Sequence, residues 1–240
     1  MEIHKPKAVH NWRELITEIG VVVVGILIAL SLEQAVESYH RHQKYLEARE
    51  AVRSEIGNNL SNLAHRQSML PCIKRRLAEI GALLDRAEGH GAIDPVNWVG
   101  DSYTLRIRYS AEADNGNSDL FSSGEQRQYG LIYAWLHAVD LEQTNERLAW
   151  AHLQAMEGRS TVPPEMINSL RIALADARYE DDRIHFLLEW LRVGARQAGI
   201  QPVENPDMLS VVPTVWPQCI AMSTPREEAL RQTKWFIEKY

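Results

Sequence analysis

The sequence lacks the short motifs that mark the common catalytic sites. The G-x-S-x-G elbow, the Walker A and G-x-G-x-x-G loops, the H-E-x-x-H zinc motif and C-x-x-C are all missing. Each motif places fixed residue types at a fixed spacing, so the enzyme classes built on them are disfavoured. Aspartate and glutamate are abundant, yet no pair stands out by its surroundings. The sequence therefore predicts no catalytic residue, no metal ligand and no cofactor.

A surplus of positive charge is also missing. The chain has 26 Lys and Arg against 32 Asp and Glu, a formal net charge of -6. The first 18 residues balance, so the whole negative excess belongs to the rest of the chain. Because an acidic domain repels phosphate backbones, the charge argues against a nucleic-acid partner.

One apolar run stands out near the start of the chain. Residues 19–32 contain fourteen positions without a charge, an amide or a proline. As a helix they cover about 21 Å, short of the bilayer core of about 30 Å, so the span must extend to residues 15–36. Trp12 and Tyr39 lie 27 residues apart, or about 40 Å of helix, and would sit at the two interfaces. The pattern predicts a transmembrane helix over 15–36 with the lipid bilayer as its partner.

Three other interpretations of this run stay open. A signal peptide also has a basic start and a short apolar centre, and Ala29-Leu30-Ser31 resembles a cleavage site. Four successive valines suit a buried parallel strand, although no comparable β-branched run follows. Apolar runs of this length also occur as core helices of soluble proteins.

The numbers of Lys and Arg residues flanking the span on its two sides are equal. Lys5, Lys7 and Arg13 precede it, and Arg41, Lys44 and Arg49 follow it. The free amino terminus breaks the tie toward a cytoplasmic N-terminus, residues 1–14. The domain of residues 37–240 would then lie outside the cytoplasm, in the periplasm of a double-membraned bacterium.

The segment up to residue 90 carries helical periodicity. Apolar residues from Val36 to Leu63 recur at spacings of three, four and seven, which predicts that the membrane helix continues into a stalk. A second apolar stripe, in which spacings of three and four residues alternate, follows at Leu70, Ile73, Leu77, Ile80 and Leu84. Pro71 should kink the helix or begin a new one, and Gly89 to Gly91 should end it.

The remaining sequence predicts further helices around one irregular part. Residues 90–121 are irregular, and the alternation over 103–109 suits a short strand. Ser122 and Glu125 form a capping box for a helix to Gly158, and Pro163-Pro164 opens another that ends near Gly199. A proline-rich segment over 201–223 and a C-terminal helix from Thr224 complete a mainly α, antiparallel helical bundle.

Several short sequences in the first 90 residues support a family resemblance: Trp12-Arg13-Glu14, Glu18-Ile19-Gly20, Gly25, Ile28-Ala29-Leu30, Glu33-Gln34, Leu70-Pro71-Cys72 and Arg75-Arg76-Leu77. Together they resemble an uncharacterised family of small bacterial proteins. The resemblance implies a single N-terminal membrane helix and a helical domain. It carries no activity, substrate or catalytic residue.

Cys72 and Cys219 are the only cysteines, and each lies beside a proline. In a periplasmic domain a disulfide between them would persist, and it would close a loop worth about 4 to 5 kcal/mol at most. Two buried free thiols are the alternative, because spacing alone does not establish pairing.

Other polar and small residues give weaker signals. Gly25 and Ala29 lie four apart and would let a second membrane helix approach closely, although small residues are common in such helices. Glu37 and His40 have a spacing seen in di-iron bundles, but no second copy exists, so a polar face is the simpler interpretation. Lys74-Arg75-Arg76 reads as the solvent side of its helix.

These patterns favour a non-catalytic, single-pass protein of the bacterial inner membrane. Its helical domain would act as a scaffold or sensor, or bind another envelope protein, and the membrane helix could mediate self-association. The alternative is a membrane-tethered enzyme whose site forms around residues 90–121, because loops often carry chemistry that short motifs miss.

Overall fold

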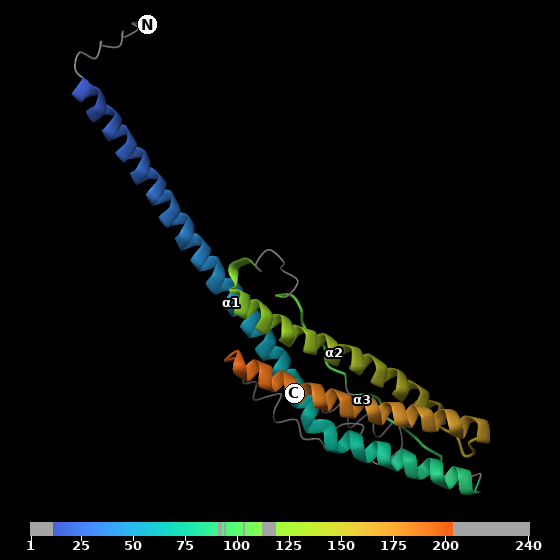
Figure 1. Cartoon of the computed structure of the whole chain (residues 1–240). Coiled ribbons are helices and arrows are strands. Elements are labelled where there is room, and N and C mark those ends of the chain that lie inside the picture. The colour runs from blue at the N-terminus through green and yellow to red at the C-terminus, as the bar shows by residue number, and fades with distance from the viewer. Residues whose placement is uncertain (1–11, 91–92, 94, 103, 112–118, 204–240) are drawn as a thin grey trace. The chain divides into compact units, whose positions relative to one another are not determined.

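A computed structural model describes most of the chain (Figure 1). It describes residues 12–90, 93, 95–102, 104–111 and 119–203. The helices in this part are α1 (Trp12–His90), α2 (Ser123–Leu153), the 3-10 helix η2 (Gln154–Met156) and α3 (Pro164–Gln197). The described residues contain no β-strand, and Val96 and Glu157 form an isolated bridge. The predicted mainly α fold is confirmed.

The chain divides into two compact units, Met1–Arg49 and Glu50–Tyr240. The first contains the apolar run of α1. In the second, residues 50–90 of α1 pack with α2, with α3 and with the segment that joins α1 to α2. We call the described part of the second unit, residues 50–203, the helical domain.

The ends of α2 and α3 follow from local sequence. Ser122 Oγ accepts from the Glu125 N–H at 3.3 Å, and the Glu125 carboxylate accepts from the Ser122 N–H at 3.1 Å, so the predicted capping box is present. Pro164 begins α3, where its missing N–H costs no helical hydrogen bond.

Gly199 ends α3 as predicted. It has φ +63°, a left-handed conformation that glycine adopts without strain. The Gly199 N–H donates to the Arg196 carbonyl at 3.0 Å, and the Ile200 N–H donates to the Ala195 carbonyl at 2.8 Å. This pair of bonds is a Schellman motif, which satisfies carbonyls that a helix end leaves free.

Pro71 does not begin a new helix, because α1 continues through it to His90, and the alternative of a kink stays a prediction. Proline removes one backbone donor from a helix interior. Tertiary packing offsets this loss here, since Met69, Cys72 and Ile73 beside it are buried.

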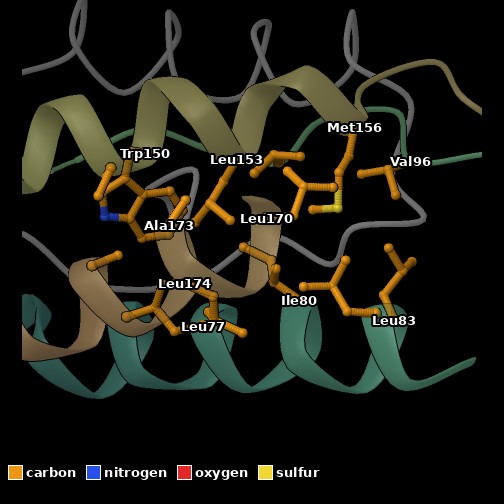
Figure 2. Close-up of a cluster of buried hydrophobic side chains, with 14 of the residues drawn as sticks. Leu77, Ile80, Leu83, Val96, Trp150, Leu153, Met156, Leu170, Ala173 and Leu174 are labelled. Carbon is orange, nitrogen blue, oxygen red and sulfur yellow. The ribbon is translucent and has the colours of Figure 1, made fainter. Parts of the chain in front are cut away.

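The helical domain has two clusters of buried apolar side chains. The first contains Trp150, Leu153 and Met156 from the α2 and η2 region, packed against α3 and against the predicted stripe of α1 (Figure 2). The stripe residues Ile73, Leu77, Ile80 and Leu84 are at most 2% exposed. The second cluster joins Ile56, Leu136 and Leu191 with their neighbours near the start of the domain.

An extended segment takes the place of a fourth helix. The described residues of 93–111, called the strap here, run back along the domain from the end of α1 toward the start of α2. Ile93 bonds near Ser160, whereas Ala111 bonds to Glu55 close to the start of the domain. Because the strap returns the chain, α1 and α2 run in the same direction and α3 runs antiparallel to both (Figure 1).

Side chains, rather than a β-sheet, hold the strap. Asn59 of α1 accepts from the Arg108 N–H at 3.0 Å and donates to the Arg108 carbonyl at 2.8 Å. Gln143 of α2 does the same for Leu105, at 2.7 and 3.2 Å. The predicted strand over 103–109 is therefore wrong for its described residues: they are extended, but their backbone pairs with side-chain amides and has no neighbouring strand.

The basic run after Pro71 differs from the expectation of a solvent-facing side. Lys74 and Arg75 are exposed as predicted, but Arg76 is 1% exposed. It forms an ion pair with Glu79 at 3.0 Å. Arg76 follows Ile73 by three residues and therefore lies on the same side of α1 as the core stripe.

Candidate functional site

The apolar part of α1 has no protein cover in the structure. Every side chain from Ile19 to Leu32 is exposed, including four valines at 47–68%. By length and composition this helix is a candidate membrane span. A long, wholly apolar surface exposed to water is unfavourable, so this part of α1 needs lipid or protein around it.

The predicted anchor and contact residues all lie on this part of α1. Trp12 is 72% exposed and Tyr39 is 61% exposed, one at each end of the apolar run. A Cβ added at Gly25 would meet no atom within 4 Å, and Ala29 one turn later is exposed. The surface around Gly25 is thus open to a second helix, while a contact there stays a prediction.

The most unusual polar feature of the helical domain is a buried charge cluster. Arg66 of α1 lies between Glu146 of α2 and Asp181 of α3, and its Nη2 is 3.0 Å from the Glu146 Oε2 and 3.3 Å from the Asp181 Oδ1. All three side chains are at most 3% exposed. One guanidinium therefore joins all three long helices inside the core.

The charges of this cluster do not balance when both carboxyls are ionised. Burial raises the pKa of Asp181 to about 7, and Glu146 adds to the shift while Arg66 opposes it. Burial also raises the pKa of Glu146, and Arg66 offsets only part of that effect. A buried net negative charge is costly, so near neutral pH the cluster favours one bound proton beside the Arg66 pair.

A second pair of carboxyls bridges α2 and α3 closer to the surface. Burial and a hydrogen bond with Glu142 raise the pKa of Glu180 to about 7. Burial also raises the pKa of Glu142, but hydrogen bonds from Glu180 and Arg183 outweigh it and hold that pKa below its usual value. The Arg183 Nη2 lies 3.1 Å from the Glu142 Oε1 and connects the two helices.

A third buried carboxylate, Glu55, fixes the end of the strap. It accepts from the Ser110 hydroxyl, from the Ala111 N–H at 3.0 Å and from the Tyr133 hydroxyl at 2.8 Å. Burial raises the pKa of Glu55, yet these hydrogen bonds outweigh burial and hold the pKa below its usual value. Glu55 is an ionised structural acceptor in this arrangement.

The hollows described in the helical domain reach only the lower end of the size range of small-molecule sites. Three hollows of the helical domain measure about 180, 250 and 360 Å³. Small-molecule sites commonly enclose about 300 to 1,000 Å³ and converge several polar groups on the ligand. Asp181 borders the hollow of 250 Å³ together with Lys74 and Arg178, but Lys74 already pairs with Asp182 at 3.1 Å.

The described residues include one of the two cysteines and no metal-binding cluster. No group of three His, Cys, Asp or Glu side chains there could hold a metal ion. Cys72 is buried in the first apolar cluster. Cys219, the proline-rich segment after Val203 and the predicted C-terminal helix lie outside the described residues, so the disulfide stays a prediction.

The sequence analysis missed the buried charge cluster and the amides that hold the strap. A signal for the cluster exists, because each of its members occupies a core position of a helical stripe. Arg66 lies three residues from both Leu63 and Met69, and Asp181 lies four after Ala177 and three before Ile184, all of them buried apolar residues. A charged residue at such a position indicates a buried partner.

No family model matches the chain, and neither a curated protein nor a solved structure matches it.

Proposed function

We propose that the protein is a single-pass membrane protein whose helical domain has a non-catalytic scaffolding, sensing or partner-binding role. The observation that carries the proposal is the uncovered apolar helix from Ile19 to Leu32, bounded by Trp12 and Tyr39. Lipid is the solvent in which such a surface is stable, and the aromatic pair has the spacing of the two interfaces.

The domain supports the non-catalytic part of the proposal. Its buried carboxylates are used within the fold: Glu55 accepts from the strap, and Glu146 and Asp181 face Arg66. The strap, where the alternative of an enzyme would place its site, binds Asn59 and Gln143 with its own backbone. No arrangement of these groups favours a particular reaction.

The proposed compartment and orientation are based on the positive charges around the membrane span and on the family resemblance. With a cytoplasmic N-terminus and a bacterial inner membrane, the helical domain lies in the periplasm and meets another envelope protein there. That compartment would also favour a Cys72–Cys219 disulfide. Self-association through Gly25 and Ala29 belongs to the same proposal, because both lie on the exposed part of α1.

Membrane fractionation with a carbonate wash tests the anchor. The full-length chain should stay in the membrane pellet, and protease added to the periplasmic side should digest the domain. Replacing Val23 and Leu27 with arginine should release the protein, since each central charge costs about 2.5 to 3.5 kcal/mol of insertion. Ser38→Arg, at an exposed position beyond the run, is the matched control and should remain in the pellet.

Recovery of the unprocessed wild-type chain in the supernatant would refute the anchor. A shortened chain beginning after residue 31 would instead identify a cleaved signal peptide. Protection of the domain from external protease, with digestion only after lysis, would reverse the orientation.

A further inference from the structure

The α2–α3 pair has an apolar surface that the domain itself does not cover. Its large side chains are 43–61% exposed and come from both helices: Leu131, Leu141 and Leu148 of α2, and Ile172, Tyr179, Phe186, Trp190 and Val193 of α3. We call these eight residues the outer face. They lie on the side of each helix away from the buried clusters and beside the α2–α3 contact.

The spacing of the outer face is regular. Ile172, Tyr179, Phe186 and Val193 follow one another at intervals of seven residues. Such an interval keeps side chains on one side of a helix and is the period of helix-to-helix seams. The core residues of α3, such as Ala177, Ile184 and Leu191, form a separate seven-residue series on the opposite side. The helix thus has two apolar sides, of which the domain buries one.

Aromatic contacts join the two halves of the outer face. Trp190 of α3 lies 6.1 Å from the half-buried Trp135 of α2, measured between ring centroids. Phe186 lies 6.1 Å from Trp190 in an edge-on arrangement. The α2 and α3 helices lie side by side along their lengths (Figure 1). The exposed residues therefore form one continuous surface across both helices.

The two helices contribute side chains of different size to this surface. Between Leu131 and Leu148, the same side of α2 presents Ala134, Ala138 and Asn145, with Glu142 beside them in its pair with Arg183. At Gly130, one turn before Ala134, an added Cβ would meet nothing within 4 Å. α3 presents its three large aromatic residues instead. At these positions the α2 half of the outer face carries small side chains, and the α3 half carries large ones.

We propose that the outer face is a self-association surface, on which a second copy of this chain packs its own α2–α3 pair. A two-fold axis parallel to the helices would place α3 of one copy on α2 of the other. The Trp135–Trp190 and Glu142–Arg183 contacts show which residues of α2 and α3 lie at the same height along the helix pair. Ala134 lies at about the height of Trp190, and Ala138 at about the height of Phe186. A two-fold axis preserves these levels, so the aromatic residues of each copy meet the small residues of the other.

The size of the surface fits this occupant. The three aromatic residues have about 150 to 250 Å² each to bury and are about half exposed, and together with the five aliphatic residues they offer at most about 800 Å² per copy. Stable interfaces bury about 800 Å² on each partner, whereas the largest apolar patch of a monomer is usually about 300 to 600 Å².

The mass of the full-length chain in mild detergent tests the proposal. Wild type should be a dimer of its 27.4 kDa polypeptide at micromolar concentration. Phe186→Glu should raise the dissociation constant about 30-fold or more, because it buries a charge at a central contact. Ala82→Glu adds the same charge at an exposed position of α1 and should leave the dimer intact. The thermal midpoint of each variant checks the fold.

A photo-crosslinking residue at Ala134 gives a second measurement that does not depend on the stability of the Phe186 variant. In membranes it should form an adduct of two chains, with the crosslink mapped near Trp190. A monomeric wild type would overturn the proposal, as would a dimer lost in Gly25→Leu but unchanged in Phe186→Glu. An adduct with lipid or with a different protein would equally overturn it and identify another occupant.

Discussion

Asn59 forms with Arg108 the two backbone hydrogen bonds that a neighbouring β-strand would otherwise form. Its amide oxygen accepts from the Arg108 N–H at 3.0 Å, and its amide nitrogen donates to the Arg108 carbonyl at 2.8 Å. Asn59 is fully buried, so neither water nor another strand would replace these bonds. The strap therefore depends on single side chains of α1 and α2.

Asn59→Ala should lower the free energy of unfolding by about 1 to 3 kcal/mol, because it leaves a backbone donor and acceptor of the strap without partners. Chemical denaturation followed by circular dichroism measures this change. Asn58→Ala is the matched control, since Asn58 donates only to the Ser54 carbonyl of its own helix. Equal effects of the two substitutions would contradict the role given to Asn59.

Arg66→Ala should lower the free energy of unfolding by about 3 to 5 kcal/mol, because it leaves two buried carboxyls without their cation. Arg192→Ala removes an exposed pair with Glu189 and should change stability by less than about 1 kcal/mol. Thermal and denaturant unfolding of both variants measure the difference. A loss no greater than that of Arg192→Ala would exclude a structural role for the cluster.

The stability of the domain should fall as pH rises toward neutrality. Asp181 has a pKa of about 7 in the folded chain, against about 3.9 when unfolded. Between these values the folded state holds a proton that the unfolded state has released, so raising the pH costs stability. We expect a negative slope between about pH 5 and pH 7.

Asp181→Asn should flatten this slope, since it removes the titrating group while keeping its shape. Glu180 also has a pKa of about 7 and acts in the same direction, so part of the slope should remain. Unfolding free energies at several pH values provide the measurement. A slope unchanged by Asp181→Asn would place the proton elsewhere.

Mass spectrometry of the non-reduced protein should show a peptide that joins Cys72 to Cys219. Cys72 is buried in the first apolar cluster, so alkylation must follow denaturation without reductant. Reduction should also lower the stability, by about 4 to 5 kcal/mol at most in the chain-entropy model. Alkylation of both thiols in protein taken from cells would end the disulfide proposal and weaken the periplasmic location.

Gly25→Leu should reduce crosslinked dimer in membranes if the helices of the first unit touch at Gly25 and Ala29. The larger side chain would occupy the open space beside Gly25, where an added Cβ meets nothing within 4 Å, and would keep a second helix at a distance. Gly20→Leu, at an exposed glycine on the opposite side of the helix, serves as the control. An unchanged dimer fraction in Gly25→Leu would remove this contact from the proposal.

The sequence was sufficient for the helices because their ends and stripes are local signals. Ser122 with Glu125, Pro164 and Gly199 mark the ends of α2 and α3, and the structure has them at those ends. Pro71 showed the limit of such signals, since packing of its neighbours keeps α1 helical through it.

The pairings within the strap and the buried cluster were beyond this kind of prediction for a different reason. Asn59 and Arg108 lie 49 residues apart, and Arg66 and Asp181 lie 115 apart. No periodicity connects such pairs, and a single asparagine or arginine in a helix usually faces solvent. Only the tertiary arrangement brings the partners together.

The strap should form its hydrogen bonds late in the folding of the domain. Asn59 and Gln143 come from helices that are remote in sequence, so the strap gains its bonds only after both helices have docked. Its amides at Leu105 and Arg108 should then exchange with heavy water as slowly as those of the core helices. A segment without regular secondary structure would thus report on complete folding, and its loosening would be the first sign that α1 and α2 have separated.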